Sequence, residues 1–138
     1  MDYEEYERLC DARREENGKY LNIFEADLKE AGLKPKTIKN HVFNVDFYIN
    51  EFLLRMEPLE MQEGCGYEID GFLGDFFIRK CMWSTPATIK STAASIKKFY
   101  KSMHEHGHVD QDSYRELCDE IKDSMEIWQE ECEAYNDF

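Results

Sequence analysis

The chain has 138 residues and a mass of 16.5 kDa, a length that suits one domain built around one core. Its hydrophobic fraction of 42% excludes wholesale disorder, although 34% of the residues are charged. Its net charge of -13 argues against indiscriminate nucleic-acid binding, because such binding depends on neutralising phosphates.

No apolar run approaches the ~20 residues that cross a bilayer, and the acidic N-terminus does not resemble a signal peptide. We therefore expect a cytoplasmic protein. The five cysteines contain no Cys-x-x-Cys pair, which predicts reduced thiols rather than a disulfide framework or a zinc site. They are Cys10, Cys65, Cys81, Cys118 and Cys132.

The negative charge is concentrated at the two ends of the sequence. Residues 1–32 contain 10 acidic and 5 basic side chains, and residues 108–138 contain 11 and 2. Residues 33–107 contain 9 acidic and 10 basic side chains. A nearly neutral middle is thus flanked by acidic segments.

Helical periodicity begins near the N-terminus. Residues 2–17 form a charged, helix-prone segment, which we expect Gly18 to interrupt. A second helix is predicted near 19–31, and Gly32 suits the left-handed residue that ends a helix. Pro35 suits the first turn of a third helix, expected to be the longest and to end before Pro58.

The second half of the chain continues the helical pattern. Residues 57–66 are expected to form a loop, and a shorter helix is predicted at about 67–81, with core residues Phe72, Phe76 and Phe77. Thr85 can cap a helix that starts at Pro86 and ends at Gly107. A last helix is expected from Asp110 to about Tyr135, with Asp110 or Asp112 as its cap, which predicts an all-α protein of five or six helices.

Two of these helices begin with the same motif, Pro-x-Thr-Ile-Lys, at Pro35 and at Pro86. When the two prolines are aligned, core positions coincide, for example Ile38 with Ile89 and Val45 with Ile96. The two helices could share this motif because it is a common way to begin a helix. Alternatively, the two helix starts could share a function.

The residues around both copies of this motif resemble the sequences of a known protein family. The segments YLNIFEADLKEAGLKPKTIKNHVFNVDFYINEFL and STPATIKSTAASIKKFYKSMHEHGHV resemble the first and last parts of the N-terminal core-binding (SAM-like) domain of tyrosine recombinases, which include phage integrases. YEIDGFLGDFFIRKC lies where that family places its third helix. The resemblance covers residues 19–109 and implies a compact orthogonal bundle of four core helices, to which 1–18 and 110–138 add acidic helical extensions.

The resemblance also implies a partner, double-stranded DNA, and a DNA-binding surface. In the family, the starts of the two long helices lie against the groove and backbone of the duplex, where hydroxyls and lysines suit phosphate and an asparagine can read a base edge. The matching positions are Lys34, Lys36, Thr37, Lys39, Asn40, His41, Thr85, Thr88, Lys90, Ser91, Ser95, Lys97, Lys98 and Lys101.

The sequence departs from the family in its catalytic half. After residue 109 the only arginine is Arg115 and there is no histidine, so Tyr135 lacks the cationic partners of a strand-transfer nucleophile. We expect a non-catalytic module, associated with DNA integration or recombination, that uses no cofactor. The alternative is a helical protein-interaction module that has lost DNA binding.

Two further features leave alternatives open. The acidic last helix could fold back on the bundle, mask the lysines by mimicking DNA, or pair with another chain. His104, His106 and His108 straddle a helix end without a further ligand nearby, so no metal site is expected.

Overall fold

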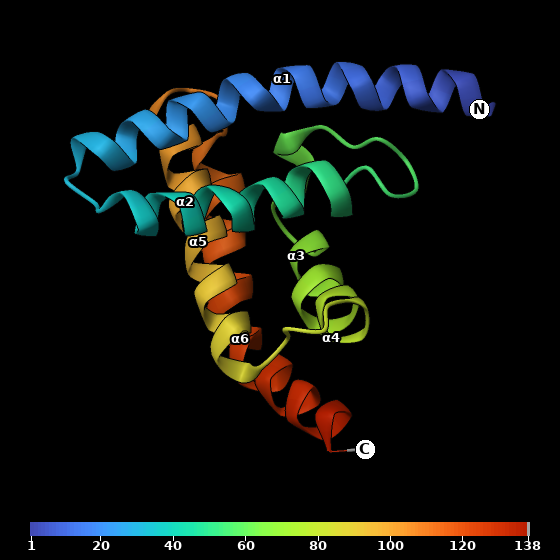
Figure 1. Cartoon of the computed structure of the whole chain (residues 1–138), viewed down its shortest axis with the longest axis vertical. Helices are drawn as coiled ribbons and strands as arrows, with labels where there is room; N and C mark the ends of the chain where they lie inside the picture. The colour runs from blue at the N-terminus through green and yellow to red at the C-terminus, as the bar shows by residue number, and fades with distance from the viewer. Residues whose placement is uncertain (138) are drawn as a thin grey trace. The chain divides into compact units, whose positions relative to one another are not determined.

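The computed structural model describes residues 1–137, which form an all-α fold without a β-strand in that range (Figure 1). The chain divides into two compact units, Met1–Gly64 and the part that begins at Cys65. Each unit is described by itself. No helix within residues 1–137 has the length and apolar character needed to cross a membrane.

The first unit begins with helix α1, Tyr3–Glu30, whose N-terminus is capped by the Asp2 carboxylate. Asp2 Oδ1 accepts a hydrogen bond of 2.8 Å from the Glu5 amide. The helix continues through Gly18, so the predicted break there is wrong. A glycine inside a helix costs only about 1 kcal/mol, and the burial of neighbours such as Asn17 and Tyr20 outweighs it.

Helix α1 ends as the sequence predicted. Gly32 has a φ of 82°, and its amide bonds the Lys29 carbonyl at 3.0 Å. The Leu33 amide bonds the Leu28 carbonyl at 3.2 Å, which completes a Schellman motif. The turn leads into helix α2, Pro35–Asp46, which starts at Pro35 as expected.

Helix α2 continues directly into a π-helical segment, η1, Phe47–Phe52, and this run ends before Pro58. Its buried face contains Ile38, Val45 and Ile49. The expectation that this helix is the longest is wrong, because α1 has 28 residues and helix α6, Gln111–Asn136, has 26. A short 3₁₀ helix, η2, Met61–Gly64, closes the unit.

Side chains of α1 bond the backbone carbonyls around the C-terminal end of η1, where an isolated helix would leave carbonyls without partners. Arg14 donates to the Asn50 carbonyl at 3.3 Å, and the buried Asn17 amide donates to the Ile49 carbonyl at 3.3 Å. Tyr6 donates to the Leu54 carbonyl, and Arg13 donates to the Pro58 carbonyl at 3.3 Å. The acidic first segment is therefore an integral part of its unit.

The second unit starts with a helical run of three parts, namely α3, Glu68–Gly71, the π-helical η3, Phe72–Phe76, and α4, Phe77–Lys80. Phe72 and Phe77 are buried, whereas Phe76 is half-buried. The predicted helix and two of its three aromatic core residues are thereby confirmed.

Helix α5, Pro86–Glu105, packs along helix α6 in this unit (Figure 1). Gly107 ends α5 with a φ of 82°, and the Asp110 carboxylate caps α6 by accepting from the Ser113 amide at 2.7 Å. The same bond lowers the pKa of Asp110. The buried side chains of α6 include Leu117 and Trp128, so the acidic last helix supplies core to this unit.

Trp128 fixes α6 against the 68–80 run. Its indole N–H donates to Asp70 Oδ1 at 2.6 Å, and its side chain is 1% exposed. A Cβ at Gly74 would lie 2.8 Å from Trp128 Cδ1 and 3.1 Å from Asp70 Oδ1. Glycine at this position therefore permits the contact between the two helices.

The five cysteine thiols are free, as predicted. Burial is the main cause that raises the pKa of Cys65 to about 12 and the pKa of Cys81 to about 11. Because thiolates are the reactive form, these two cysteines are chemically inert near neutral pH.

Candidate nucleic-acid interface

The predicted DNA-binding residues fall on one helix in each unit. Six of them lie on the N-cap and first two turns of α2 in the first unit, and the others lie on α5 and its cap in the second unit. The expectation that both helix starts share one surface stays a prediction.

Helix α5 exposes four lysines along its solvent side, which we call the lysine stripe: Lys90, Lys97, Lys98 and Lys101. Their spacing places Lys90, Lys97 and Lys101 on one line along the helix. The first acidic side chain of α5 is Glu105 at its last position. None of the ion pairs among residues 1–137 involves the stripe, so its positive charge faces solvent.

The hydroxyl residues at the start of α5 serve the helix itself. Thr85 Oγ1 accepts from the Thr88 amide at 3.0 Å, and Thr88 Oγ1 accepts from the Thr85 amide at 2.8 Å. This capping box confirms the predicted cap at Thr85. Ser91 is exposed, but Ser95 is 1% exposed and donates to the Ser91 carbonyl at 3.1 Å. Including Ser95 among DNA-facing residues was wrong, because its side chain lies on the buried side.

Helix α2 also presents an uncapped, basic start. Lys34 is its N-cap and makes no capping hydrogen bond through its side chain, and the first turn contains no acidic residue. The exposed side chains include Lys36, Thr37, Lys39 and Asn40, whereas His41 is half-buried. The first acidic residue of α2 is Asp46. Twelve consecutive positions, 34–45, therefore carry no carboxylate.

Sequence reasoning missed one exposed residue on this face. Phe43 is 55% exposed, although it stands between the core-facing positions Val42 and Val45. Its place in the helical period could have revealed it, since residues 36, 40 and 43 follow one line opposite the buried Ile38 and Val45. The α2 face, which we define as Lys36, Lys39, Asn40 and Phe43, thus combines charge, an amide and an aromatic ring.

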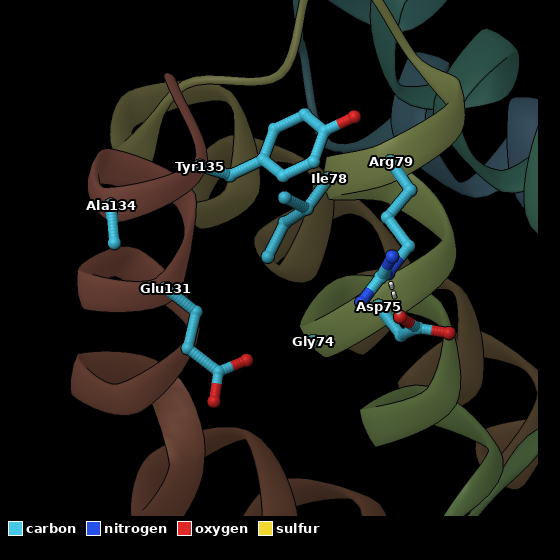
Figure 2. Close-up of a pocket in the computed structure, with 7 residues that line it drawn as sticks. All are labelled: Gly74, Asp75, Ile78, Arg79, Glu131, Ala134 and Tyr135. Carbon is cyan, nitrogen blue, oxygen red and sulfur yellow. Dashed lines mark hydrogen bonds and ion pairs between the residues drawn. The ribbon is translucent and has the colours of Figure 1, made fainter. Parts of the chain in front are cut away.

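A shallow hollow of about 280 Å³ lies elsewhere in the second unit, between the 68–80 run and the end of α6 (Figure 2). Arg79 lines it and is paired with Asp75, with 2.6 Å between Arg79 Nε and Asp75 Oδ1. Glu131 and Tyr135 line it as well. With two carboxylates and one guanidinium, the hollow lacks the positive charge that would favour a phosphate.

His104, near the end of α5, contributes to local packing. His104 Nδ1 lies 2.9 Å from the Val109 carbonyl oxygen, and its ring stacks on Tyr114 with centroids 5.8 Å apart. Residues 1–137 contain no group of three or more His, Cys, Asp or Glu side chains placed to bind a metal ion.

Comparisons of the chain with protein-family models, with curated protein sequences and with solved structures found no match. The fold and its surfaces define an all-helical protein that presents a lysine stripe on α5 and a basic, carboxylate-free start on α2.

Proposed function

We propose that this protein is a non-catalytic module that binds double-stranded DNA and is associated with DNA integration or recombination. The observation that carries the proposal is the lysine stripe, whose four exposed ammonium groups have no carboxylate partner among residues 1–137. Lysines in such an arrangement release counterions when they meet phosphates, which is the main source of affinity for duplex DNA.

The negative net charge is compatible with this proposal because it is unevenly distributed. Helix α6 carries nine acidic and two basic residues, whereas α5 carries four lysines and one acidic residue. Repulsion between the acidic surface and phosphates would restrict a duplex to the basic faces and suppress other orientations. Weak binding that depends steeply on salt is the expected behaviour.

We also propose that the fold is the orthogonal four-helix bundle of integrase core-binding domains. Its four core helices would be the second half of α1, the α2–η1 run, the 68–80 run and α5. The Schellman turn before Pro35 and the capping box before Pro86 support this, since both lie where the resemblance places the helix starts. We likewise propose that the protein has no catalytic activity and is located in the cytoplasm.

Binding of the full chain to a generic duplex, measured by fluorescence anisotropy at several salt concentrations, tests the function. The variant Lys97→Gln/Lys101→Gln removes two charges of the stripe, and Lys19→Gln/Lys122→Gln removes two exposed lysines elsewhere. We expect the stripe variant to bind about tenfold more weakly near 0.1 M salt and to reduce the salt slope by about 2. The control should bind like the wild type.

Equal losses in the two variants, or no binding even at low salt, would contradict the proposal. The second outcome would favour a protein-interaction module. That alternative is supported by Ile127 and Tyr135, which are 56% and 46% exposed on the acidic helix α6.

Lys34 offers a test that separates stability from binding. We expect Lys34→Ser to raise the free energy of unfolding by about 0.5–2 kcal/mol, because serine can cap α2 and Lys34 does not. The same change should weaken DNA binding, since it removes one positive charge at the helix start. Urea unfolding followed by circular dichroism and anisotropy titration check the two effects.

The matched control for this variant is Lys36→Ser, which removes the same charge inside the first turn. It should weaken DNA binding without stabilising the protein. A Lys34→Ser protein that is more stable but binds DNA unchanged would remove Lys34 from the interface.

A further inference from the structure

We propose that the α2 face reads base pairs in the major groove and selects A·T pairs, with Asn40 bound to an adenine and Phe43 in contact with a thymine methyl group. This inference rests on the proposed DNA binding and adds a sequence preference to it.

Both side chains are exposed and make no hydrogen bond or ring contact of their own within the described residues. Phe43 is 55% exposed, and Asn40 is exposed. Within residues 1–137, Phe43 makes no ring contact and the Asn40 amide makes no hydrogen bond. By contrast, Asn17, Asn50 and Asn136 all use their amides in hydrogen bonds. Asn40 and Phe43 are therefore available to a partner.

The charge of the α2 face determines the kind of partner that it suits. Lys36 and Lys39 lie on the α2 face with Asn40 and Phe43, Lys34 is the N-cap of the same helix, and no acidic residue occurs between positions 34 and 45. None of the ion pairs among residues 1–137 uses these three lysines. A surface of this kind matches a polyanion better than the mixed charges of an ordinary protein surface.

The spacing of the two side chains along α2 suits adjacent base pairs. Asn40 and Phe43 are three positions apart on one helix, so they are neighbours on its surface and are separated by about 4.5 Å along its axis. Base pairs follow one another at about 3.4 Å along the duplex, and the major groove admits an α-helix. The two side chains can therefore reach adjacent base pairs while the lysines contact the flanking phosphates.

The chemistry of the two side chains then defines the preference. An asparagine amide pairs with N6 and N7 of adenine through two hydrogen bonds, and a phenylalanine ring packs on the C5-methyl group of thymine. Guanine and cytosine offer neither match to this pair of side chains. A step that contains A·T pairs is consequently the favoured target.

The experiment uses the full chain and a pool of duplexes with a randomised centre. Duplexes that the wild type enriches are sequenced, and the best one is prepared with thymine or with uracil, which lacks only the methyl group. We expect A·T enrichment and about fourfold weaker binding to the uracil duplex, the factor that corresponds to about 0.8 kcal/mol for one buried methyl group.

Two variants and a control complete the design. Phe43→Ala should bind the thymine and uracil duplexes equally, and Asn40→Ala should lose the preference for adenine. Tyr3→Ala, which truncates a 71% exposed aromatic residue in the same unit, should behave like the wild type. Circular dichroism verifies that each variant is folded.

The possible results separate the inference from the proposed function. Binding without A·T enrichment, or a Phe43→Ala protein that still distinguishes thymine from uracil, would overturn the inference and leave DNA binding standing. Absence of binding to every duplex at low salt would overturn both. A Phe43→Ala protein that binds no duplex at all would also contradict base reading, since the lysines alone should retain nonspecific affinity.

Discussion

Replacing Trp128 by alanine is expected to lower the free energy of unfolding by about 3–5 kcal/mol. The side chain is 1% exposed, and it fills the space between α6 and the 68–80 run. Truncation removes its apolar contacts and leaves a cavity that the neighbouring helices can close only in part. Urea unfolding followed by far-ultraviolet circular dichroism measures the change, because the loss of an indole also alters the fluorescence.

Two further variants separate the contributions to this contact. Trp128→Phe keeps much of the ring volume but loses the hydrogen bond to Asp70, so a smaller destabilisation of about 1–3 kcal/mol is expected. Ile127→Ala changes the adjacent, 56% exposed residue and should have an effect within about 0.5 kcal/mol. A Trp128→Ala protein as stable as Ile127→Ala would show that α6 does not depend on this contact.

The second large effect is expected at Asn17. Its amide donates to the Ile49 carbonyl at 3.3 Å and to Asn50 Oδ1 at 2.8 Å, while Asn50 donates to Asp46 Oδ1 at 2.6 Å. Asn17→Ala should lower the free energy of unfolding by about 1–3 kcal/mol, because it leaves the buried Ile49 carbonyl and the half-buried Asn50 Oδ1 without their donor.

The control for this change is Asn22→Ala, which makes the same substitution at an exposed position of α1. Its effect should stay within about 0.5 kcal/mol. Thermal unfolding of the three proteins at one pH makes the comparison. Similar melting temperatures for Asn17→Ala and Asn22→Ala would contradict the stabilising role of the Asn17 hydrogen bonds.

The sequence predicted helix ends better than helix interiors. Gly32, Pro35, Thr85 and Gly107 occupy the predicted cap or turn positions, and α6 is capped by Asp110, one of its two candidate caps. These features depend on φ preferences and on hydrogen bonds within a few residues, which a single sequence contains. The all-α class followed from the helical spacing of the apolar residues.

Distant contacts explain what the sequence did not predict. Gly18 remains helical because Asn17 and Tyr20 on either side are buried, and no local pattern reveals the carbonyl that Asn17 bonds. The π-helical segments Phe47–Phe52 and Phe72–Phe76 gave no signal either. Propensity is a weak guide where tertiary contacts decide the backbone.

The sequence-based candidates included the basic residues and the asparagine of the candidate site but not its aromatic residue. The lysines of α5 and the first residues of α2 were singled out by the resemblance to the integrase family. The structure exposes these lysines, Thr37 and Asn40, whereas His41 is half-buried. Phe43 was overlooked because the candidate residues were those that match the family's helix starts, and Phe43 was not among them. Only its phase relative to Ile38 and Val45 distinguishes it.

Helix α1 tolerates insertions and deletions poorly because of the hydrogen bonds that it donates from Tyr6, Arg13, Arg14 and Asn17. One inserted or deleted residue between Tyr6 and Asn17 would turn every donor on one side of the change by about 100° around the helix axis. Such a change would separate several donors from their carbonyls at once. Insertions should instead accumulate in the exposed turn at Arg55–Glu57, where the chain reverses without a regular helix.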